Sequence, residues 1–460
     1  STYEWSGLID DVRIYNRALS SSEVGSLANG NAYTGSGVYE LGSSLDINGD
    51  LKMYTGGIRE AGYGNGVTIS GSWLNYGGQF VAGSGTITFD GTPDQANQEI
   101  IYENVGFNNL TLDNGLVGYW KFDEGAGTVA RDSSANGNDG TLTNMDAEDW
   151  VDISAGTGTT NFYNPYALDF DGSNDYVDAG STINTGYIDG ATALTAMTWV
   201  KLDVLTSRRF WLANFVNQYG IGFEWDSGVG WRNYVTNGNW NSRGTTGTSG
   251  YVADQWYHLV VRYDGNGTGN SGKLKFYVNG TEKTLTYDGT ITSSIGTAQE
   301  SLLIGSYNTN SPMKGLLDDV RIYNRALSAS EVENLANGNP STGSGYYNLG
   351  ASLDIAGDFA NYTGNLVSSG SITMSGNWLN VGDFTHDGSG TVLFDGSDQT
   401  ISGSTVFWKL QSTGSTADTL TFDYTARQNI SGSLVLEGVD GGLLSVESSK
   451  SGSASKLLLD

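Results

Sequence analysis

Two short loops of this chain are dense in side chains that carry oxygen. They read RDSSANGNDG at residues 131–140 and LDFDGSNDYVD at residues 168–178. Ca²⁺ takes about six to eight oxygen ligands from carboxylates, Asn side chains and backbone carbonyls. We therefore predict a structural calcium ion, with ligands drawn from Asp132, Asn138, Asp139, Asp171 and Asp175. Asp, Asn and Gly are also the residues that tight turns require, so a turn-forming role is the alternative.

A second candidate for chemistry is an aromatic run at residues 222–244, GFEWDSGVGWRNYVTNGNWNSRG. Sugar C–H faces stack on aromatic rings, while Asn and Asp side chains can bind hydroxyl groups. We predict a glycan-binding site at Trp231, Tyr234 and Trp240, with Trp231 and Trp240 exposed because Gly and Asn flank them. A contact between domains is the alternative use of these rings.

The sequence offers little for catalysis. Its two histidines, His258 and His386, have no nucleophile motif beside them, which disfavours a Ser-His-Asp triad. Glycoside hydrolysis needs two carboxylates that face one cleft. The closest acidic pairs are adjacent in sequence, so in a strand they point to opposite faces: Asp123 with Glu124, and Asp318 with Asp319. We predict that the protein is not an enzyme.

Composition excludes several classes of partner. The 460 residues include 50 acidic and 22 basic side chains and carry a net charge of −28. This charge repels nucleic acid and anionic lipid and favours cations. No apolar run approaches the ~18 residues of a membrane span. Without cysteine there is no disulfide and no thiolate metal site.

The chain repeats itself over a long period. Residues 7–30 are identical to residues 315–338 at 20 of 24 positions, at an offset of 308. The similarity continues from 34–50 to 342–358, and from 69–91 to 374–396 at an offset of 305. The chain therefore holds about one and a half copies of a 308-residue unit.

Residues 116–338 contain aromatic strands separated by Gly, Asn and Asp turns. In KLKFYVNG at 273–280, Leu274, Phe276 and Val278 alternate with polar residues, as in a half-buried antiparallel strand. Many such strands in one segment predict a two-sheet sandwich or jelly roll. Ser328 and Glu331 form a capping box that predicts a helix ending near Gly338.

This segment resembles the concanavalin A-like, laminin-G-like jelly-roll domains of extracellular proteins. The motifs are GLVGYWKFDEGAGTVARDSSANGNDGTL (115–142), ALDFDGSNDYVDAG (167–180), QWYHLVVRYDG (255–265) and GLLDDVRIYNRALSASEV (315–332). The resemblance implies a sandwich with Asp-rich turns, often a structural calcium, and recognition of glycans or proteins. In such a fold the closing strand can lie near the opening strand, which adds Asp318 and Asp319 to the calcium candidates.

Residues 31–115 and 339–460 have a different pattern. Short strands recur after about twenty residues, as in SLDIAG, SITMSG, TVLFDG, TLTFDY and SLVLEG. One such strand cannot bury a core, but stacked rungs of a parallel β-helix share one. These rungs resemble the solenoid repeats of filamentous-haemagglutinin-type surface proteins. A small immunoglobulin-like sandwich is the alternative.

The sequence thus predicts an all-β protein in which a jelly-roll sandwich alternates with parallel β-helix (solenoid) segments. The expected segments are an orphan closing strand and helix at 1–30, a solenoid at 31–115, the jelly roll at 116–338 and a solenoid at 339–460. The orphan would leave an apolar face formed by Leu8, Val12, Ile14, Tyr15 and Leu19. Covering this face needs upstream tandem sequence, a head-to-tail copy of the protein, or another part of the same chain. We expect an extracellular or cell-surface structural protein of a fibre or filament. The alternative is a glycan-binding surface adhesin.

Overall fold

A computed structural model describes residues 38–459 of the chain, with gaps at 54–56, 61–63, 76–78, 82, 91–97, 102–105, 113–114, 135, 154–164, 216, 299, 308–310, 338–345, 350–351, 362–364, 369, 387, 389, 414–417 and 441. The proposed orphan strand at 1–30 and its assembly residues lie outside the described residues. No helix in the described part is both long and apolar enough to cross a membrane.

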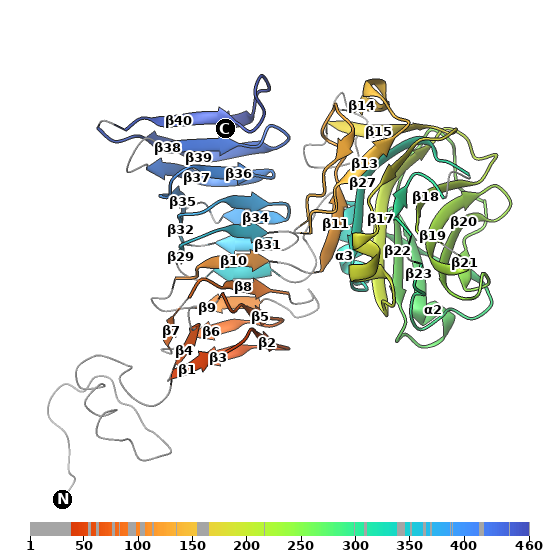
Figure 1. The fold of residues 1–460 in the computed structure, drawn as a ribbon, viewed down its shortest axis with the longest axis horizontal. Coiled ribbons are helices and arrows are strands. Elements are labelled where there is room, and N and C mark those ends of the chain that lie inside the picture. Colours follow the sequence, from red (N-terminus) through yellow and green to blue (C-terminus); the bar gives the residue numbers. More distant parts are fainter. Residues whose placement is uncertain are drawn as a thin grey trace, which may run out of the picture.

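The protein is all-β and consists of a parallel solenoid with an antiparallel jelly roll at its side (Figure 1). Both predicted architectures are confirmed. The pairs between solenoid strands are parallel, so the immunoglobulin-like alternative for the flanking segments is wrong.

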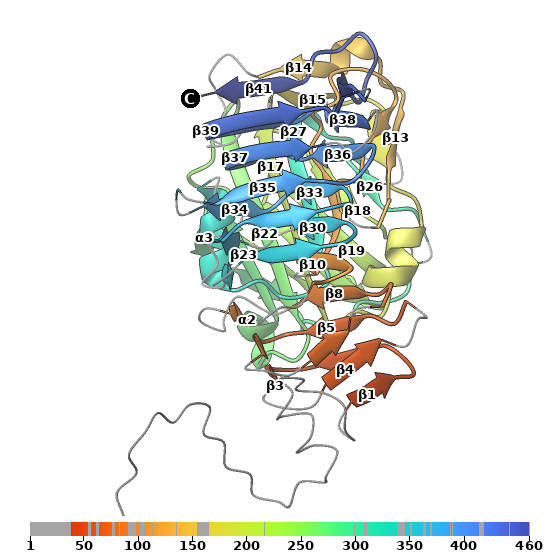
Figure 2. The ribbon, with the colours of Figure 1, turned by 90° about the vertical axis from the view of Figure 1, so that its left-hand side faces the viewer.

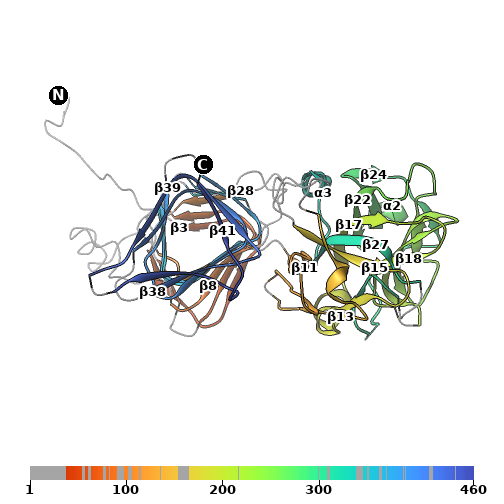
Figure 3. The same cartoon turned by 90° about the horizontal axis from the view of Figure 1, so that it is seen from above.

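The solenoid has three faces, which are visible when it is viewed along its stack (Figure 3). The first face contains β2 (Leu45–Ile47), β5 (Val67–Ile69), β8 (Thr86–Phe89), β10 (Asn109–Leu112), β30 (Phe359–Asn361), β33 (Trp378–Asn380), β36 (Gln399–Ser402), β38 (Asp418–Phe422) and β40 (Leu444–Ser448). The second contains β3 (Leu51–Met53), β6 (Trp73–Asn75), β9 (Gln98–Ile101), β28 (Tyr346–Leu349), β31 (Asn365–Ser368) and β34 (Asp383–His386).

The third face is built from two groups of strands. Its lower part contains β1 (Val38–Leu41), β4 (Gly57–Glu60) and β7 (Gln79–Val81). Its upper part contains β29 (Leu353–Ile355), β32 (Ile372–Met374), β35 (Thr391–Phe394), β37 (Thr405–Thr413), β39 (Arg427–Glu437) and β41 (Lys456–Leu459). Phe107, which lies between β9 and β10 in the chain, forms a parallel bridge to Ile355 of β29.

The two solenoid segments form one continuous stack, although about 230 residues separate them in sequence. β10 pairs in parallel with β30, from Leu110 opposite Phe359 to Leu112 opposite Asn361. Alternate residues of the central strands point inward and are buried, while those of strands near the ends, such as β2 and β40, are only partly buried. One apolar core therefore runs through both segments. Figure 2 shows the strands as a ladder that passes beside the jelly roll.

The jelly roll consists of two antiparallel sheets. The proximal sheet faces the solenoid and contains β11 (Leu116–Trp120), β14 (Trp150–Asp152), β15 (Tyr166–Asp171), β27 (Lys314–Tyr323), β17 (Ala193–Leu202), β22 (Trp256–Asp264), β23 (Leu274–Val278) and β24 (Thr281–Lys283). The distal sheet contains β12 (Val129–Ala130), β13 (Gly140–Thr143), β16 (Tyr176–Asp178), β26 (Leu303–Ile304), β18 (Arg209–Ala213), β19 (Tyr219–Asp226), β20 (Gly230–Asn237), β21 (Arg243–Thr245) and β25 (Thr286–Asp288).

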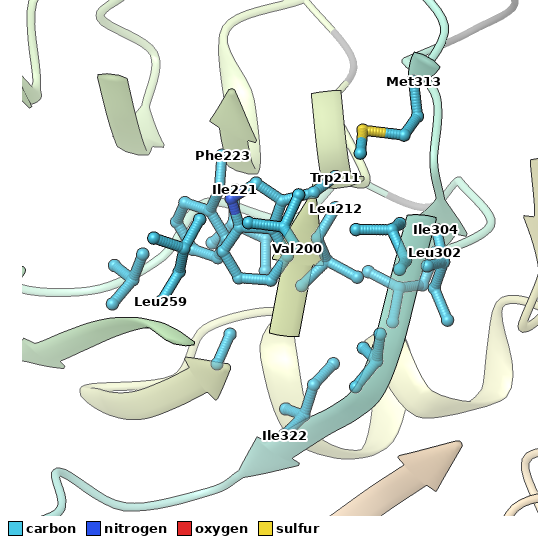
Figure 4. Packing of buried hydrophobic residues seen from close by; sticks show 14 of the residues in the cluster. Val200, Trp211, Leu212, Ile221, Phe223, Leu259, Leu302, Ile304, Met313 and Ile322 are labelled. Atoms are coloured by element: carbon cyan, nitrogen blue, oxygen red, sulfur yellow. The ribbon is translucent and has the colours of Figure 1, made fainter. Parts of the chain in front are cut away.

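Four short helical turns or helices connect these strands: a 3₁₀ turn at Ala147–Asp149, a π-helical turn at Asn184–Ile188, α2 (Gly269–Lys273) and α3 (Ala329–Ala336) among the described residues. Between the sheets lies one large apolar core, part of which is shown in Figure 4, where Trp211 and Phe223 of the distal sheet meet Val200 and Leu259 of the proximal sheet.

Helix α3 covers the outward side of the proximal sheet. As predicted, it begins with a capping box, in which the Glu331 amide donates to Ser328 Oγ at 3.3 Å and the Ser328 amide donates to the Glu331 carboxylate at 2.7 Å. Its apolar side packs on the sheet, and Val381 of the solenoid joins the same cluster. This cluster is a point of contact between the jelly roll and the solenoid.

The jelly roll begins and ends at adjacent positions. Leu116 of β11 pairs with Tyr323 of β27, and the Asn324 amide donates to the Gly115 carbonyl at 2.8 Å. The chain therefore leaves the solenoid after β10 and returns close to where it left. In space the jelly roll is a lateral insertion into one solenoid.

Candidate functional site

The outward face of the distal sheet holds a group of aromatic rings. In the register of β19 and β20, Gly222 lies opposite Tyr234 and Glu224 lies opposite Arg232. Because residues directly opposite in an antiparallel pair share a face, these four positions point away from the core, whereas Phe223 and Trp225 point into it.

The group, here called the aromatic patch, gathers rings from different loops and strands. Phe215 is central: its ring centroid lies 5.2 Å from Tyr234, 5.0 Å from Trp240 and 5.5 Å from Tyr307. Phe210 completes the patch at 5.2 Å from Tyr307. Phe210, Phe215 and Tyr234 are buried, while Trp240 and Tyr307 are partly exposed. The patch thus offers two partly exposed rings on a base of buried aromatic rings.

Gly222 makes room for this arrangement. A Cβ atom at Gly222 would lie 1.9 Å from a ring carbon of Phe215, closer than any real contact. The Phe215 ring therefore lies directly on the backbone of β19. No side chain other than glycine fits under the ring as it stands.

An ion-pair network borders the patch. The buried Glu224 carboxylate accepts from Arg208 Nε at 2.9 Å and Nη2 at 2.8 Å, and from Arg232 Nη1 at 3.1 Å. Arg232 also pairs with Asp226 at 2.9 Å. Burial raises the pKa of Glu224, and the hydrogen bond and charge of Arg208 act against that rise. Two arginines and two carboxylates make up this network, so their charges cancel. The guanidinium groups can therefore donate hydrogen bonds at the edge of the patch without giving it a strong net positive charge.

A second arginine–aromatic contact lies at the other edge. The Arg243 guanidinium lies 5.5 Å from the Tyr234 ring centroid and is paired with Asp288. Arg232 likewise lies 5.9 Å from that ring. The patch is therefore flanked by guanidinium groups whose charges are already paired.

The structure brings together two of the three predicted glycan-binding residues. Tyr234 and Trp240 lie in the patch, with ring centroids 5.9 Å apart. The expectation that Trp231 is exposed is wrong, because it lies opposite Trp225 on the inward side of the sheet and is 1% exposed. Phe210, Phe215 and Tyr307 were missed, since they lie outside the run at 222–244 and only the sheet register brings them there.

The predicted calcium ligands of the first loop serve the loop itself. Asp132 accepts four hydrogen bonds: at Oδ1 from the Tyr119 and Ser134 amides at 2.9 and 2.8 Å, and at Oδ2 from Ser134 Oγ and the Asn138 amide, both at 2.8 Å. Asp139 accepts from the Asp132 amide at 2.8 Å. These contacts hold the loop against β11, as in a network of Asx turns.

The second loop holds two neighbouring carboxylates. The Asp171 amide donates to Asp175 Oδ2 at 2.8 Å, and Asp171 Oδ1 accepts from the Ser173 amide at 2.6 Å. Burial, followed by the nearby charge of Asp171, raises the pKa of Asp175 to about 6. No cation-binding arrangement is needed to explain this loop.

Asp319 lies beside the opening strand, whereas Asp318, its neighbour on β27, lies opposite Trp199 of β17. Asp319 accepts from the Tyr119 hydroxyl at 2.5 Å and lies 3.6 Å from Arg321, whose guanidinium stacks 4.1 Å from the Tyr119 ring centroid. Within the described residues, no group of three or more His, Asp or Glu side chains is arranged to hold a metal ion. The calcium site stays a prediction.

His258 is a buried strand residue. It is 2% exposed and packs 5.1 Å from Trp199, and burial together with the charge of Arg321 lowers its pKa to about 3. A histidine held neutral in this way is a poor proton acceptor at neutral pH. His386 lies on β34 of the solenoid, where its Nδ1 accepts from the Gly390 amide at 3.2 Å.

Comparison with known proteins identifies the jelly roll. Residues 171–333 match the family model of the concanavalin A-like lectin/glucanases superfamily. The chain therefore carries a concanavalin A-like domain of the laminin G type, flanked by β-solenoid segments. A search of curated proteins gives no match.

The matching solved structures cover about half of this chain. One is domain 4 of AbnA, an extracellular arabinanase of Geobacillus stearothermophilus in complex with arabinotriose, with 22% identity over 48% of this chain and 98% of that one, at a TM-score of 0.34. Others are the sialidase of Trypanosoma rangeli, with 16% identity over 48% of this chain and 32% of that one at 0.35, and the binding domain of botulinum neurotoxin serotype G, with 15% identity over 48% and 50% at 0.35.

Proposed function

We propose that this protein is a glycan-binding surface protein, in which the aromatic patch of the jelly roll binds a neutral oligosaccharide. The observation that carries the proposal is the patch itself. Trp240 and Tyr307 are partly exposed on a base of buried rings, which is the kind of surface on which the C–H face of a sugar can stack. The match to a superfamily that includes lectins supports the same use.

The charges around the patch favour a neutral ligand. Arg208 and Arg232 are paired with Glu224 and Asp226, and Arg243 is paired with Asp288. These groups can donate or accept hydrogen bonds to hydroxyls without attracting an anion. The net charge of −28 disfavours acidic polysaccharides in addition.

We further propose that the site binds without hydrolysis. Glu224, which shares the outward face with Tyr234, is buried and held by two arginines, so it is poorly placed to donate or accept a proton at a glycosidic bond. Glycans of this kind are met outside cells, and an extracellular or cell-surface location follows from the proposed ligand.

A glycan array followed by calorimetry tests the proposal. We expect the chain to bind a neutral oligosaccharide, and Trp240→Ala to weaken that binding at least tenfold. Trp408→Ala is the matched control, because Trp408 is also a partly exposed tryptophan, at 38%, but lies on the solenoid. An array without signal, or equal loss in both variants, would refute the proposed site.

A structural role in a fibre is the second candidate. The observation in its favour is the single solenoid core, whose parallel rungs form a stiff, extended body. Negative-stain electron microscopy of the purified protein separates the candidates, since long regular fibres would favour the structural role and dispersed particles that bind a glycan would favour the adhesin.

A further inference from the structure

The two copies of the solenoid sequence do not occupy the same faces of the solenoid. β2 and β29 have the same sequence, Leu-Asp-Ile, at the offset of 308. β2 lies in the first face between the edge and β5, whereas β29 lies in the third face beside β32. Equivalent residues therefore differ in position by one face.

The same displacement appears at the other equivalent strands. Trp73 of β6 corresponds to Trp378 of β33, and the strand changes from the second face to the first. Phe89 of β8 corresponds to Phe394 of β35, and the strand changes from the first face to the third. All three comparisons give the same direction of rotation.

The cause is the number of strands in the unit. In the described part, the chain passes eleven strand positions from β2 to β29, counting the position of Phe107, which bridges to Ile355. With three positions to a rung, the unit contains three and two-thirds rungs. Since neighbouring strands lie ~4.8 Å apart, each unit rises ~18 Å and ends one face away from a whole turn.

We propose that repetition of the 308-residue unit places successive jelly rolls on different faces of one solenoid, in a threefold screw arrangement. The unit does recur in this chain, because residues 7–30 repeat the end of the jelly-roll sequence at 315–338. In the second copy of the unit, β37 is followed by another solenoid strand, β38, and not by jelly-roll strands. The present chain therefore contains one whole jelly roll and two copies of the solenoid pattern.

The dimensions explain why the fraction matters. A domain of ~220 residues has a radius of gyration of ~17 Å and hence a diameter of roughly 45 Å. Two jelly rolls on one face at a spacing of ~18 Å would overlap. With rotation by one face, the same face is used again after three units, at ~53 Å, which leaves enough room.

The rotation also determines how binding sites are displayed. Each jelly roll carries its aromatic patch on the distal sheet, away from the solenoid, so repeated units would present patches in three directions. Such a display favours multivalent attachment to a surface with many copies of a ligand. The geometry itself does not depend on the glycan proposal.

The test is a chain in which residues 34–341 are duplicated in tandem, so that residue 341 is followed by a second copy of residues 34–460. Cryo-electron microscopy should show one longer solenoid with two jelly rolls, ~18 Å apart along its axis and about one third of a turn apart around it. Jelly rolls on the same face, or two separate solenoids, would overturn the proposal.

A matched control changes the strand number alone. A second copy of residues 45–50 placed at the junction adds one strand and makes the unit four whole rungs. The two jelly rolls would then point in the same direction at ~19 Å, so we expect a large loss of folded protein or a break in the solenoid. If this variant folds as well as the eleven-strand duplication, the strand count does not govern the arrangement and the proposal fails.

Discussion

At the scale of single residues, the face of the sheet decides what each aromatic side chain does. Trp231 and Tyr234 are three positions apart on β20, so one points into the core and the other into the patch. The sequence showed an aromatic run but gave no register, and flanking glycines suggested exposure where the structure has burial. Which alternate residues of a strand face the core becomes known only when its partner strand and their register are known.

This difference predicts opposite effects of two tryptophan substitutions on stability. Trp231→Ala removes a fully buried ring and should cost about 3–5 kcal/mol of unfolding free energy. Trp240→Ala removes a partly exposed ring and should cost much less. Chemical denaturation of both variants checks the prediction, and equal losses would contradict the assigned faces.

The raised pKa of Asp175 predicts that the stability of the folded protein depends on pH. Its pKa is raised to about 6, so the folded state binds this proton more tightly than the unfolded state does. The resulting stability is fully present below pH ~4 and is lost as the pH rises through 6. Asp175→Asn cannot ionise and keeps an acceptor for the Asp171 amide. Its melting temperature should exceed that of the parent at pH 7.5 and match it more closely at pH 4, whereas a constant difference would refute the raised pKa.

Bound calcium would have the opposite effect on the protonation of this loop. An ion held by Asp171 and Asp175 would favour both ionised carboxylates and would raise the melting temperature. Saturation at about a hundredfold over Kd would add ~2.7 kcal/mol. The sequence predicts stabilisation by millimolar CaCl₂ and its reversal by EDTA. Melting curves that do not change at pH 7.5 would remove calcium from the account of this protein.

At the scale of elements, the solenoid strands follow the sequence closely. The recurring Ser-Gly turns at 70–71 and 375–376 and the FDG sequences that follow them are explained by one repeated contact: Ser70 Oγ donates to Asp90 at 2.9 Å, and Ser375 Oγ donates to Asp395 at 2.9 Å. The glycine after each serine lies on the backbone of the rung below. Short apolar alternation and these turns were enough to predict rungs.

The glycine of this motif gives a prediction with an internal control. A Cβ at Gly376 would lie 2.3 Å from the backbone of Gly357, so Gly376→Ala should push two rungs apart and cost about 1–3 kcal/mol or more. Gly42, in another solenoid turn, has no atom within 4 Å of its Cβ position, and Gly42→Ala should change stability by less than about 0.5 kcal/mol. Thermal denaturation distinguishes them, and equal effects would speak against the close stacking.

At the scale of the whole molecule, sequence reasoning found the two architectures but not their arrangement. The jelly-roll motifs and the rung pattern are local, whereas the pairing of Leu110 with Phe359 joins strands across an inserted domain. The face of each copy depends on a count of strands over the whole unit, which no single residue encodes. For the same reason, the patch could be predicted only in the part that lies within one stretch of sequence.

The lateral insertion predicts that the two bodies fold without each other. Gly115 and Asn324 are hydrogen-bonded neighbours, so the jelly roll can be replaced by a short Gly-Ser linker while β10 and β30 remain paired. The isolated segment 115–337 should keep its fold, since its large core is its own. Circular dichroism and melting curves of both parts check this, and an unfolded solenoid without its insert would contradict it.

The central claim is that a glycan binds to the aromatic patch, and a crystal structure of the jelly roll with the best oligosaccharide from the array tests it most directly. We expect a sugar ring stacked on Trp240 or Tyr307, with hydroxyls within hydrogen-bonding distance of Arg208, Arg232 or Arg243. A ligand bound elsewhere on the domain, with the patch empty, would contradict the claim.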